Sequence, residues 1–358
     1  MIFILSFIIL LSVLVFVHEL GHYMAARSVG MRVEKFYIGY NLFGLGIKKM
    51  YNGTEYGIGL FPLGGYVKVA GVIDESLDSA LTGAPDEFNS KTALQKIWFL
   101  SAGVIMNMLL ALVIFIFITY NLGIADIDSK SKIVGNTLPD YPAEKIGIIS
   151  GDEIIEINDI PISNWDELSS FIHSRPNQII HLKWKRSNVI FMDSIRTIGN
   201  ERLIGDENEI RLVGMIGISP IINQKKVNII EAFSDGYKKT LYWFTMTVKS
   251  LSMIVTGSAS LDDIGGPIMI AKMAGESAKA GIWNWLNLMA VISINLAFLN
   301  ILPIPGLDGG HIFFTAIEGI IRRDLPIRLK LGIQQFGMLI LFSLMILVIY
   351  NDIVRLFN

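Results

Sequence analysis

The chain has 358 residues, a net charge of −2, 52% hydrophobic residues and only 17% charged residues. This composition excludes an ordinary pair of soluble domains, in which about a quarter of the residues carry charge, and the near-neutral charge gives no sign of nucleic-acid binding. Cysteine is absent, which excludes disulfides, a thiolate nucleophile and a cysteine-ligated metal and leaves histidine and carboxylates for any metal chemistry.

The apolar residues gather in four stretches without a charge, at 1–17, 97–125, 280–307 and 331–351. The last three exceed the roughly 20 residues that a helix needs to cross a bilayer, and the helical pattern of the first continues to Ala26. A cleavable signal peptide at 1–17 is the alternative, but no basic segment precedes it and no small-residue cleavage site follows. We predict a polytopic α-helical membrane protein with four transmembrane helices.

The first predicted helix carries the sequence His-Glu-Leu-Gly-His at 18–22. His18 and His22 are four residues apart, so both imidazoles lie on one face of a helix and can hold one ion. Glu19 is placed to take a proton from the water that the ion activates, as in the H-E-x-x-H zinc peptidases. The pattern is short, but ionisable residues within a membrane helix are costly and usually functional.

Residues 44–71 are rich in glycine and contain Asn52-Gly53, a strong signal for a tight hairpin turn. The segment 61–69 that follows has the pattern of an edge strand or a membrane-associated loop. An edge strand beside the metal motif could hold an unwound substrate by backbone hydrogen bonds. The alternative is an interfacial loop that has no part in substrate binding.

Basic residues indicate how the chain crosses the membrane. They cluster after the first predicted span, at Arg27, Arg32, Lys35, Lys48, Lys49 and Lys68, and between the last two, at Arg322, Arg323, Arg328 and Lys330. By the positive-inside rule both connections are cytoplasmic, and both termini lie outside. Residues 126–279 are also basic, but long segments cross the membrane regardless of charge, so we expect them on the outer side.

Within that outer region, the stretch 142–166 contains a helix-like start, a Gly-Asp turn, an alternating strand and an Asn-Asp turn. This order is similar to the core of a PDZ domain, which we place at 126–222. Residues 223–279 are apolar but interrupted by lysines, which favours amphipathic helices at the outer surface. A fifth span at 240–261 would put Lys249 in mid-membrane and reverse the final helices, and we reject it.

The third predicted span ends in a stretch that contains Asn300, Pro303, Pro305 and Asp308. The prolines break the helix, and irregular backbone at membrane depth needs a protein-lined or wet cavity. We expect Asp308 to terminate this span and to supply the third metal ligand, at a depth similar to that of the histidines. An exposed helix-terminating aspartate is the plain alternative, and His311 is the rival ligand.

These motifs together resemble the site-2 protease family, and specifically its bacterial PDZ-containing zinc intramembrane metalloproteases. The resemblance covers nearly the whole chain and rests on His-Glu-Leu-Gly-His, on Leu-Asp-Gly-Gly at 307–310 with Asn300 and the two prolines before it, and on Gly103 and Asn107 in the second span. It implies four consecutive regions. Residues 1–125 would form two spans and a cytoplasmic-side β-loop, and 126–222 a PDZ domain. Residues 223–279 would form interfacial helices, and 280–358 the last two spans.

The resemblance also implies a function. His18, His22 and Asp308 would bind Zn²⁺, Glu19 would be the catalytic base, and Asn300, Gly64, Gly65 and Tyr66 would contact the substrate. The enzyme would lie in a bacterial inner membrane with its PDZ domain outside. It would cut the membrane segments of single-span proteins, such as anti-sigma factors or remnant signal peptides, after an upstream site-1 protease. A membrane-anchored peptidase acting outside the bilayer and an inactive PDZ scaffold remain the alternatives.

Overall fold

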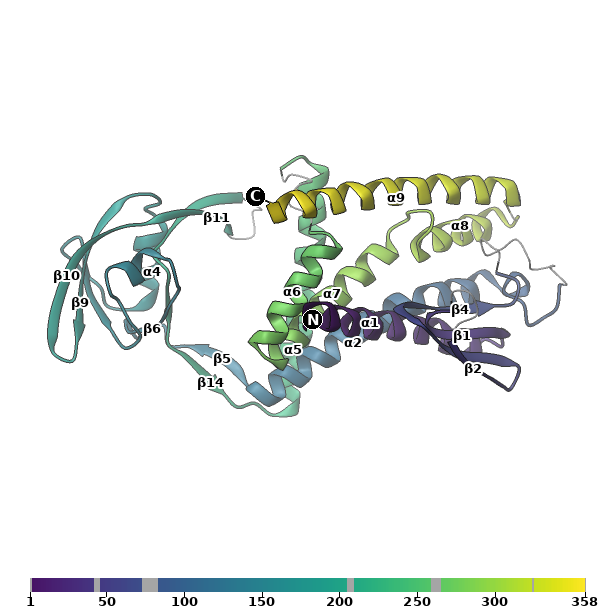
Figure 1. Cartoon of the computed structure of the whole chain (residues 1–358), viewed down its shortest axis with the longest axis horizontal. Coiled ribbons are helices and arrows are strands. Elements are labelled where there is room, and N and C mark those ends of the chain that lie inside the picture. The colour runs from purple at the N-terminus through teal and green to yellow at the C-terminus, as the bar shows by residue number, and fades with distance from the viewer. Residues whose placement is uncertain are drawn as a thin grey trace. The chain divides into compact units, whose positions relative to one another are not determined.

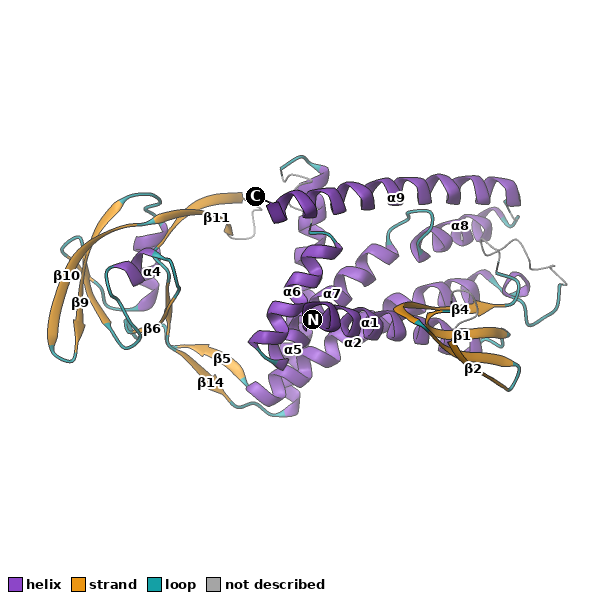
Figure 2. Cartoon of the chain, viewed as in Figure 1, coloured by secondary structure: helices purple, strands orange, loops and turns teal. Residues whose placement is uncertain are grey.

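The computed structural model describes residues 2–41, 46–72, 83–204, 209–258, 265–323 and 325–357 (Figures 1 and 2). The chain divides into two compact units. Unit 1 comprises Met1–Asn121 and Asn228–Asn358, and unit 2 comprises Leu122–Val227.

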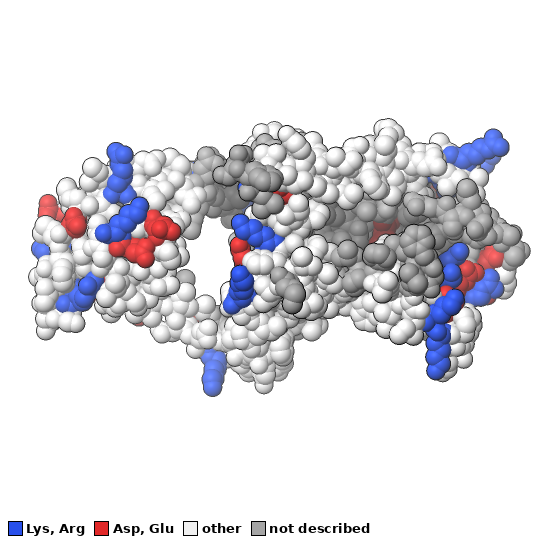
Figure 3. Space-filling view, in the orientation of Figure 1, with Lys and Arg blue, Asp and Glu red and all other residues white. Residues whose placement is uncertain are grey.

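Unit 1 is built on helices. Four of those described are long and apolar enough to cross a membrane, as the sequence predicts: α1 (Ile2–Ser28), α2 (Ala93–Leu122), α7 (Ile282–Ile301) and α9 (Ile327–Phe357). Leu10 and Leu14 of α1 pack with Phe115 of α2 and Ile294 of α7 in one buried cluster. By contrast, only 17% of the most apolar stretch of α9 is buried, and its middle presents uncharged side chains on the face shown in Figure 3. Surface of this kind is stable when lipid covers it.

The third of these helices is broken where the prolines predict a break. Helix α7 ends at Ile301, irregular backbone follows, and the short helix α8 (Asp308–Ile321) begins at Asp308. The expectation that Asp308 terminates the third span is therefore wrong, because the span has already ended and Asp308 starts a new helix. Gly309 allows this geometry, since a Cβ atom there would lie 2.1 Å from the carbonyl oxygen of Leu302.

A four-stranded sheet lies between α1 and α2 in sequence, in the order β2-β3-β1-β4. Its strands are β1 (Val33–Tyr40), β2 (Gly46–Tyr51), β3 (Thr54–Gly59) and β4 (Phe61–Val69), and a short 3-10 helix, η2 (Phe88–Ser90), precedes α2. Asn52 and Gly53 have φ values of 47° and 76°, so the hairpin turn is confirmed. Among the strands described, β4 pairs with β1 alone and forms an edge, as predicted.

Polar contacts attach this sheet to the end of α1. The Arg27 guanidinium donates to the Thr54 hydroxyl at 2.8 Å, and that hydroxyl donates to the Val33 carbonyl at 2.7 Å. The hydroxyls of Tyr23 and Tyr56 lie 2.7 Å apart. Because α1 carries both the metal motif and these anchors, the position of the sheet beside the motif is fixed by α1 itself.

Residues 223–279 contain α5 (Ile229–Val255) and all but the last residue of α6 (Pro267–Ala280), and both helices run across the direction of α9 in Figure 1. Asn228 and Glu231 form a capping box at the start of α5. The buried carboxylate of Asp352 on α9 accepts hydrogen bonds from the backbone N–H groups of Gly266, Ile268 and Met269. This carboxylate fastens the end of α9 to the N-terminus of α6, where negative charge is favoured.

Unit 2 is a small α+β unit whose described residues form a four-stranded sheet in the order β10-β9-β7-β8 and three two-stranded sheets. Its core is apolar and centres on Ile154, Leu168, Leu182 and Trp184. Asn158 and Asp159 have positive φ, which confirms the predicted Asn-Asp turn. The elements in chain order are β5 (Ile124–Ile127), β6 (Val134–Thr137), α3 (Pro142–Lys145), β7 (Glu153–Ile157), β8 (Ile160–Pro161), α4 (Trp165–His173), β9 (Ile179–Arg186), β10 (Val189–Arg196), β11 (Ile198–Ile204), β12 (Glu209–Met215), β13 (Ile218–Pro220) and β14 (Ile222–Lys225).

Candidate metal centre

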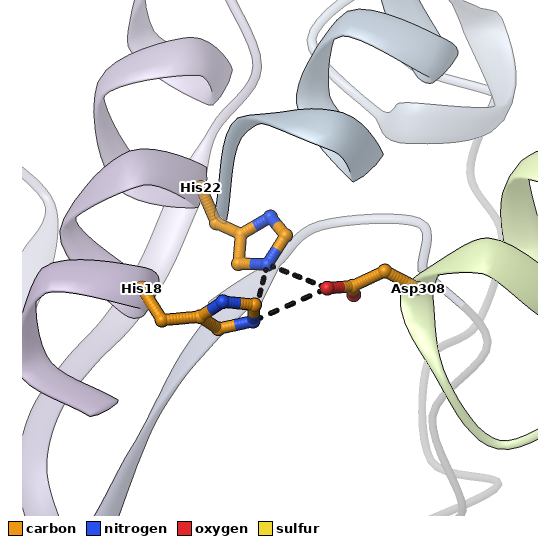
Figure 4. A group of neighbouring side chains, drawn as sticks. All are labelled: His18, His22 and Asp308. Atoms are coloured by element: carbon orange, nitrogen blue, oxygen red, sulfur yellow. Dashed lines mark hydrogen bonds and ion pairs between the residues drawn. The ribbon is translucent and has the colours of Figure 1, made fainter. Parts of the chain in front are cut away.

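Three side chains converge inside unit 1 from two helices (Figure 4). His18 and His22 lie on one face of α1 and are 8% and 6% exposed. Asp308 reaches them from the first turn of α8. Among the residues that the structure describes, these three form the group of side chains placed to hold a metal ion.

The spacing of the three donor atoms fits zinc. The Nε2 atoms of His18 and His22 are 3.2 Å apart, and Asp308 Oδ2 lies 3.2 Å from the first and 3.5 Å from the second. A tetrahedral zinc with bonds of about 2.0–2.1 Å sets its ligand atoms about 3.3 Å apart. The buried Oδ2 atom also has no conventional hydrogen-bond partner among the described residues. The residues present therefore match a three-ligand zinc site with one open position.

Helix α2 supports the two imidazoles from behind. His22 Nδ1 lies 2.9 Å from the backbone carbonyl of Phe99, so Nδ1 carries a proton and Nε2 is the nitrogen that would ligate a metal. The two helices approach closely because Gly21 and Gly103 have no side chains. A Cβ atom at Gly21 would lie 2.4 Å from the Ala102 carbonyl oxygen, and one at Gly103 would lie 2.5 Å from both imidazoles.

Glu19 lies beside the triad and faces strand β4. Its carboxylate accepts a hydrogen bond from the Val67 backbone N–H, and its Cγ is 3.6 Å from where a Gly65 side chain would begin. Backbone groups alternate between the two edges of a strand. A Val67 N–H directed at Glu19 points away from β1, so by this alternation the Gly65 N–H also faces the open edge of β4 and the Tyr66 N–H faces β1.

Aromatic stacking stiffens this edge. The rings of Tyr37 and Tyr66 stack at 5.1 Å, and Tyr40 stacks on Tyr66 at 6.3 Å. The Tyr37 hydroxyl donates to Glu55 at 2.5 Å, and burial together with this hydrogen bond raises the pKa of Tyr37 to about 12. Gly64 has a φ of 100°, a value that glycine adopts freely, next to a bulge in the pairing of β1 with β4.

A cavity of about 450 Å³ opens onto the centre between β4, α2, α8 and α9. Of the predicted site residues, His18, Glu19, His22, Asp308, Gly65, Tyr66 and His311 line it. His311 lies one turn after Asp308 but is not part of the metal-binding group among the described residues. Gly64 and Asn300 are not among the lining residues, and Asn300 is partly buried in the last turn of α7.

Sequence reasoning missed one charged feature of this cavity. Glu318 of α8 and Lys330 of α9 form an ion pair at 2.5 Å on its wall. The pair links the two helices beside the site. Neither residue belongs to a motif, and the pairing of a carboxylate with an amine across a loop leaves no periodic signal in the sequence.

A buried pair of imidazoles and one carboxylate, with a glutamate alongside, defines the centre of a mononuclear metallopeptidase. The chain belongs to peptidase family M50, the site-2 proteases: the family model matches residues 6–344. It is 36% identical to a protein of Clostridium perfringens provisionally named a zinc metalloprotease, over 96% of each chain. It is 29% identical to the zinc metalloprotease RasP of Geobacillus kaustophilus, over 99% of this chain and 98% of that protein.

These relatives are named as zinc enzymes, so zinc is the cofactor, as predicted. Four apolar helices and this family membership also make the chain a membrane protein. Among solved structures, the PDZ domain of an SdrC-like protein from Listeria monocytogenes matches 27% of the chain at 20% identity with a TM-score of 0.21. A second domain of another Listeria protein matches 27% at 22% identity with a TM-score of 0.19.

Proposed function

We propose that this zinc metalloprotease cuts peptide bonds within the membrane, in the transmembrane segments of single-span proteins. One observation carries the proposal. Two of the three metal-binding side chains project from α1, a helix apolar enough to span, and at 1.5 Å per residue His18 lies about 24 Å from one end and about 15 Å from the other. Both distances place the centre inside a hydrocarbon core about 30 Å thick.

In this proposal His18, His22 and Asp308 hold the zinc, which supplies Lewis acidity and makes water a nucleophile near neutral pH. Glu19 is the general base: it accepts the proton of the attacking water and delivers it to the departing amine. The Glu19 carboxylate is partly buried beside the histidines, within reach of a water in the open position. The surrounding apolar helices limit the access of bulk water to this step.

The open edge of β4 binds the substrate. A helix in the membrane has its carbonyl groups bonded to its own N–H groups, so a scissile carbonyl becomes accessible after local unwinding. The Gly65 N–H then replaces a lost helical partner by strand addition, and the Val67 N–H exchanges its bond to Glu19 for one to the substrate. Gly64 supplies the bulge that shapes this edge, and Tyr66 lines the cavity where substrate side chains lie. Asn300, by resemblance to the family, assists at the substrate backbone or the developing oxyanion.

The proposed site of action is the bacterial inner membrane, with both termini and residues 126–222 on the outer side and the sheet on the cytoplasmic side. The positive-inside distribution of Arg and Lys supports this orientation. Single cysteines at Ser129 and Ser187 should react with impermeant thiol reagents in intact cells, and one at Asn52 should not. The reverse labelling pattern would overturn the orientation.

We further propose that 126–222 is a PDZ domain that acts as a size filter. It would exclude proteins with bulky outer domains until an upstream site-1 protease has trimmed them, so the substrates would be anti-sigma-factor-like proteins or remnant signal peptides. No nucleic acid takes part. Deleting the domain should then widen the choice of substrates while zinc content and cleavage of short single-span substrates persist. Loss of zinc on deletion would instead show a structural role.

The decisive experiment reconstitutes the purified chain in proteoliposomes with a tethered single-span substrate and locates the cut by mass spectrometry. Cleavage within the apolar run, absent in a Glu19→Gln control, supports intramembrane proteolysis. Cuts confined to the polar flanks would support a membrane-anchored peptidase of juxtamembrane segments. Absence of any zinc-dependent cleavage would support a scaffold that binds through unit 2.

A further inference from the structure

We propose that Asn107 is a positioning residue for the metal centre: its side-chain carbonyl accepts a hydrogen bond from His18 Nδ1–H and so fixes the ring with Nε2 directed at the zinc. This inference rests on the zinc ligands of the proposed function. Asn107 lies on α2, a helix that supplies none of the three ligands.

The argument begins with the proton on the His18 ring. His18 Nε2 lies 3.2 Å from both Asp308 Oδ2 and His22 Nε2, so ligation requires a lone pair on Nε2 and the proton on Nδ1. His18 is only 8% exposed, and a buried N–H without an acceptor is destabilising because it has lost its hydrogen bond to water. The Nδ1–H group therefore needs an acceptor from the protein.

The side chain that meets Nδ1 is that of Asn107. Its Nδ2 atom lies 3.4 Å from His18 Nδ1. When Nδ1 is protonated, both of these nitrogens are donors, so they cannot form a hydrogen bond with each other. Its Oδ1 atom is buried and has no hydrogen-bond partner among the described residues. The two ends of an asparagine amide are assigned from the surrounding hydrogen bonds. Exchanging them turns the facing donors into a donor and an acceptor and satisfies the orphaned oxygen.

The placement of Asn107 is suited to this role. The residue is fully buried, and its backbone carbonyl accepts a hydrogen bond from Ser293 of α7 at 2.8 Å. Phe99, Gly103 and Asn107 are spaced four residues apart, so they share one face of α2. That face meets His22 through the Phe99 carbonyl, and His18 through Asn107. One helix thus supplies an acceptor to each imidazole.

Zinc affinity is the readout that separates positioning from packing. The full-length protein in detergent is stripped of metal, and its zinc dissociation constant is measured by competition with a chelator. Removal of such a supporting hydrogen bond typically weakens metal binding about 10–100-fold, which is the loss expected for Asn107→Leu. Asn107→Asp keeps an acceptor oxygen and should bind zinc within a few-fold of the wild type. Bound Co²⁺ should show an altered visible spectrum in Asn107→Leu and a native one in Asn107→Asp.

Ser293→Ala is the matched control, because it removes a buried hydrogen bond to the Asn107 backbone and leaves the side-chain acceptor in place; its zinc affinity should stay within a few-fold of the wild type. Asn107→Ala serves as a second acceptor-free variant if the leucine disturbs folding. Native zinc affinity with a native cobalt spectrum in the acceptor-free variants would overturn the inference, as would an aspartate variant no better than leucine. If the wild type and His18→Ala bind zinc equally, the ligand set of the proposed function fails instead.

Discussion

Gly103 of α2 lies so close to His18 of α1 that a Cβ atom at this position would come within 2.5 Å of the ring carbon Cε1. The same atom would also come within 2.5 Å of His22 Nε2, one of the donor atoms. Because Gly103 has no side chain, α2 leaves the space that both imidazoles occupy.

Gly103→Ala should accordingly displace one or both histidines and reduce the zinc content of the purified protein. Gly332→Ala is the control, since this glycine also lies within a helix but a Cβ there would meet no atom within 4 Å. The zinc content of that variant should equal that of the wild type. Its free energy of unfolding should be unchanged or higher by up to about 1 kcal/mol, because alanine has the higher helix propensity. Native zinc content in Gly103→Ala would show that α1 and α2 separate without disturbing the site.

Binding and catalysis should separate within the metal centre. Glu19→Gln preserves shape but cannot accept a proton, so it should retain zinc while cleavage falls by about 10²–10⁴-fold, the usual contribution of a general base. Alanine at His18, His22 or Asp308 should reduce bound zinc as well as activity, whereas His311→Ala should retain its zinc. Metal analysis beside a cleavage assay decides the matter. Normal cleavage by Glu19→Gln, or loss of zinc in His311→Ala alone, would refute these roles.

The alternation of backbone groups along β4 distinguishes two proline substitutions. The Val67 N–H bonds Glu19 and so faces the open edge, and by alternation the Tyr66 N–H faces β1. Val67→Pro should therefore raise KM well above that of Val67→Ala with zinc content intact, because proline removes a donor to the substrate. Tyr66→Pro should instead loosen the sheet, and hydrogen exchange in β1 should increase. A fall in kcat without a change in KM would assign Val67 to orienting Glu19 rather than to holding substrate.

Unit 2 should lose stability in acid through Asp152. This carboxylate is fully buried and accepts hydrogen bonds from Arg186 Nε and Nη2, both at 2.7 Å, and from the Ile149 N–H at 2.9 Å. Burial raises its pKa, but the three hydrogen bonds and the guanidinium charge outweigh burial and hold the pKa below the ordinary 3.8. Its contribution to stability is thus complete above that ordinary value and is lost as the pH falls through the folded-state pKa.

Hydrogen exchange of the β7 and β9 amides in the full-length protein, corrected for intrinsic rates, measures this effect. Protection should decrease at low pH in the wild type. Asp152→Asn should reduce protection already at neutral pH and flatten the acid response, and Asp193→Asn, at an exposed carboxylate on β10, should change neither. An unchanged acid response in Asp152→Asn would assign the titration to another group.

Local patterns determined much of this protein. The four-residue spacing of His18 and His22 places both on one helix face wherever that helix lies, since helical periodicity depends on near neighbours alone. Asn52-Gly53 determines a hairpin turn for the same reason, and the prolines after α7 prevent a continuous helix. The histidine motif also indicates a zinc site, and the position of Asp308 after the prolines makes it the favoured third ligand over His311; the family resemblance implies the same ligand and metal.

Tertiary structure decided what depends on distant partners. Strand β1 lies between β3 and β4 through a parallel pairing that no adjacent turn specifies, and it leaves the β4 edge open beside Glu19. Asp308 begins α8 rather than ending a span, while Gly64 and Asn300 lie outside the cavity lining. Glycines on α1 and α2 allow these two helix backbones to approach at the imidazoles, and Gly309 allows the tight turn from which Asp308 reaches them. Such convergence depends on packing between segments remote in the chain, and local periodicity carries no information about it.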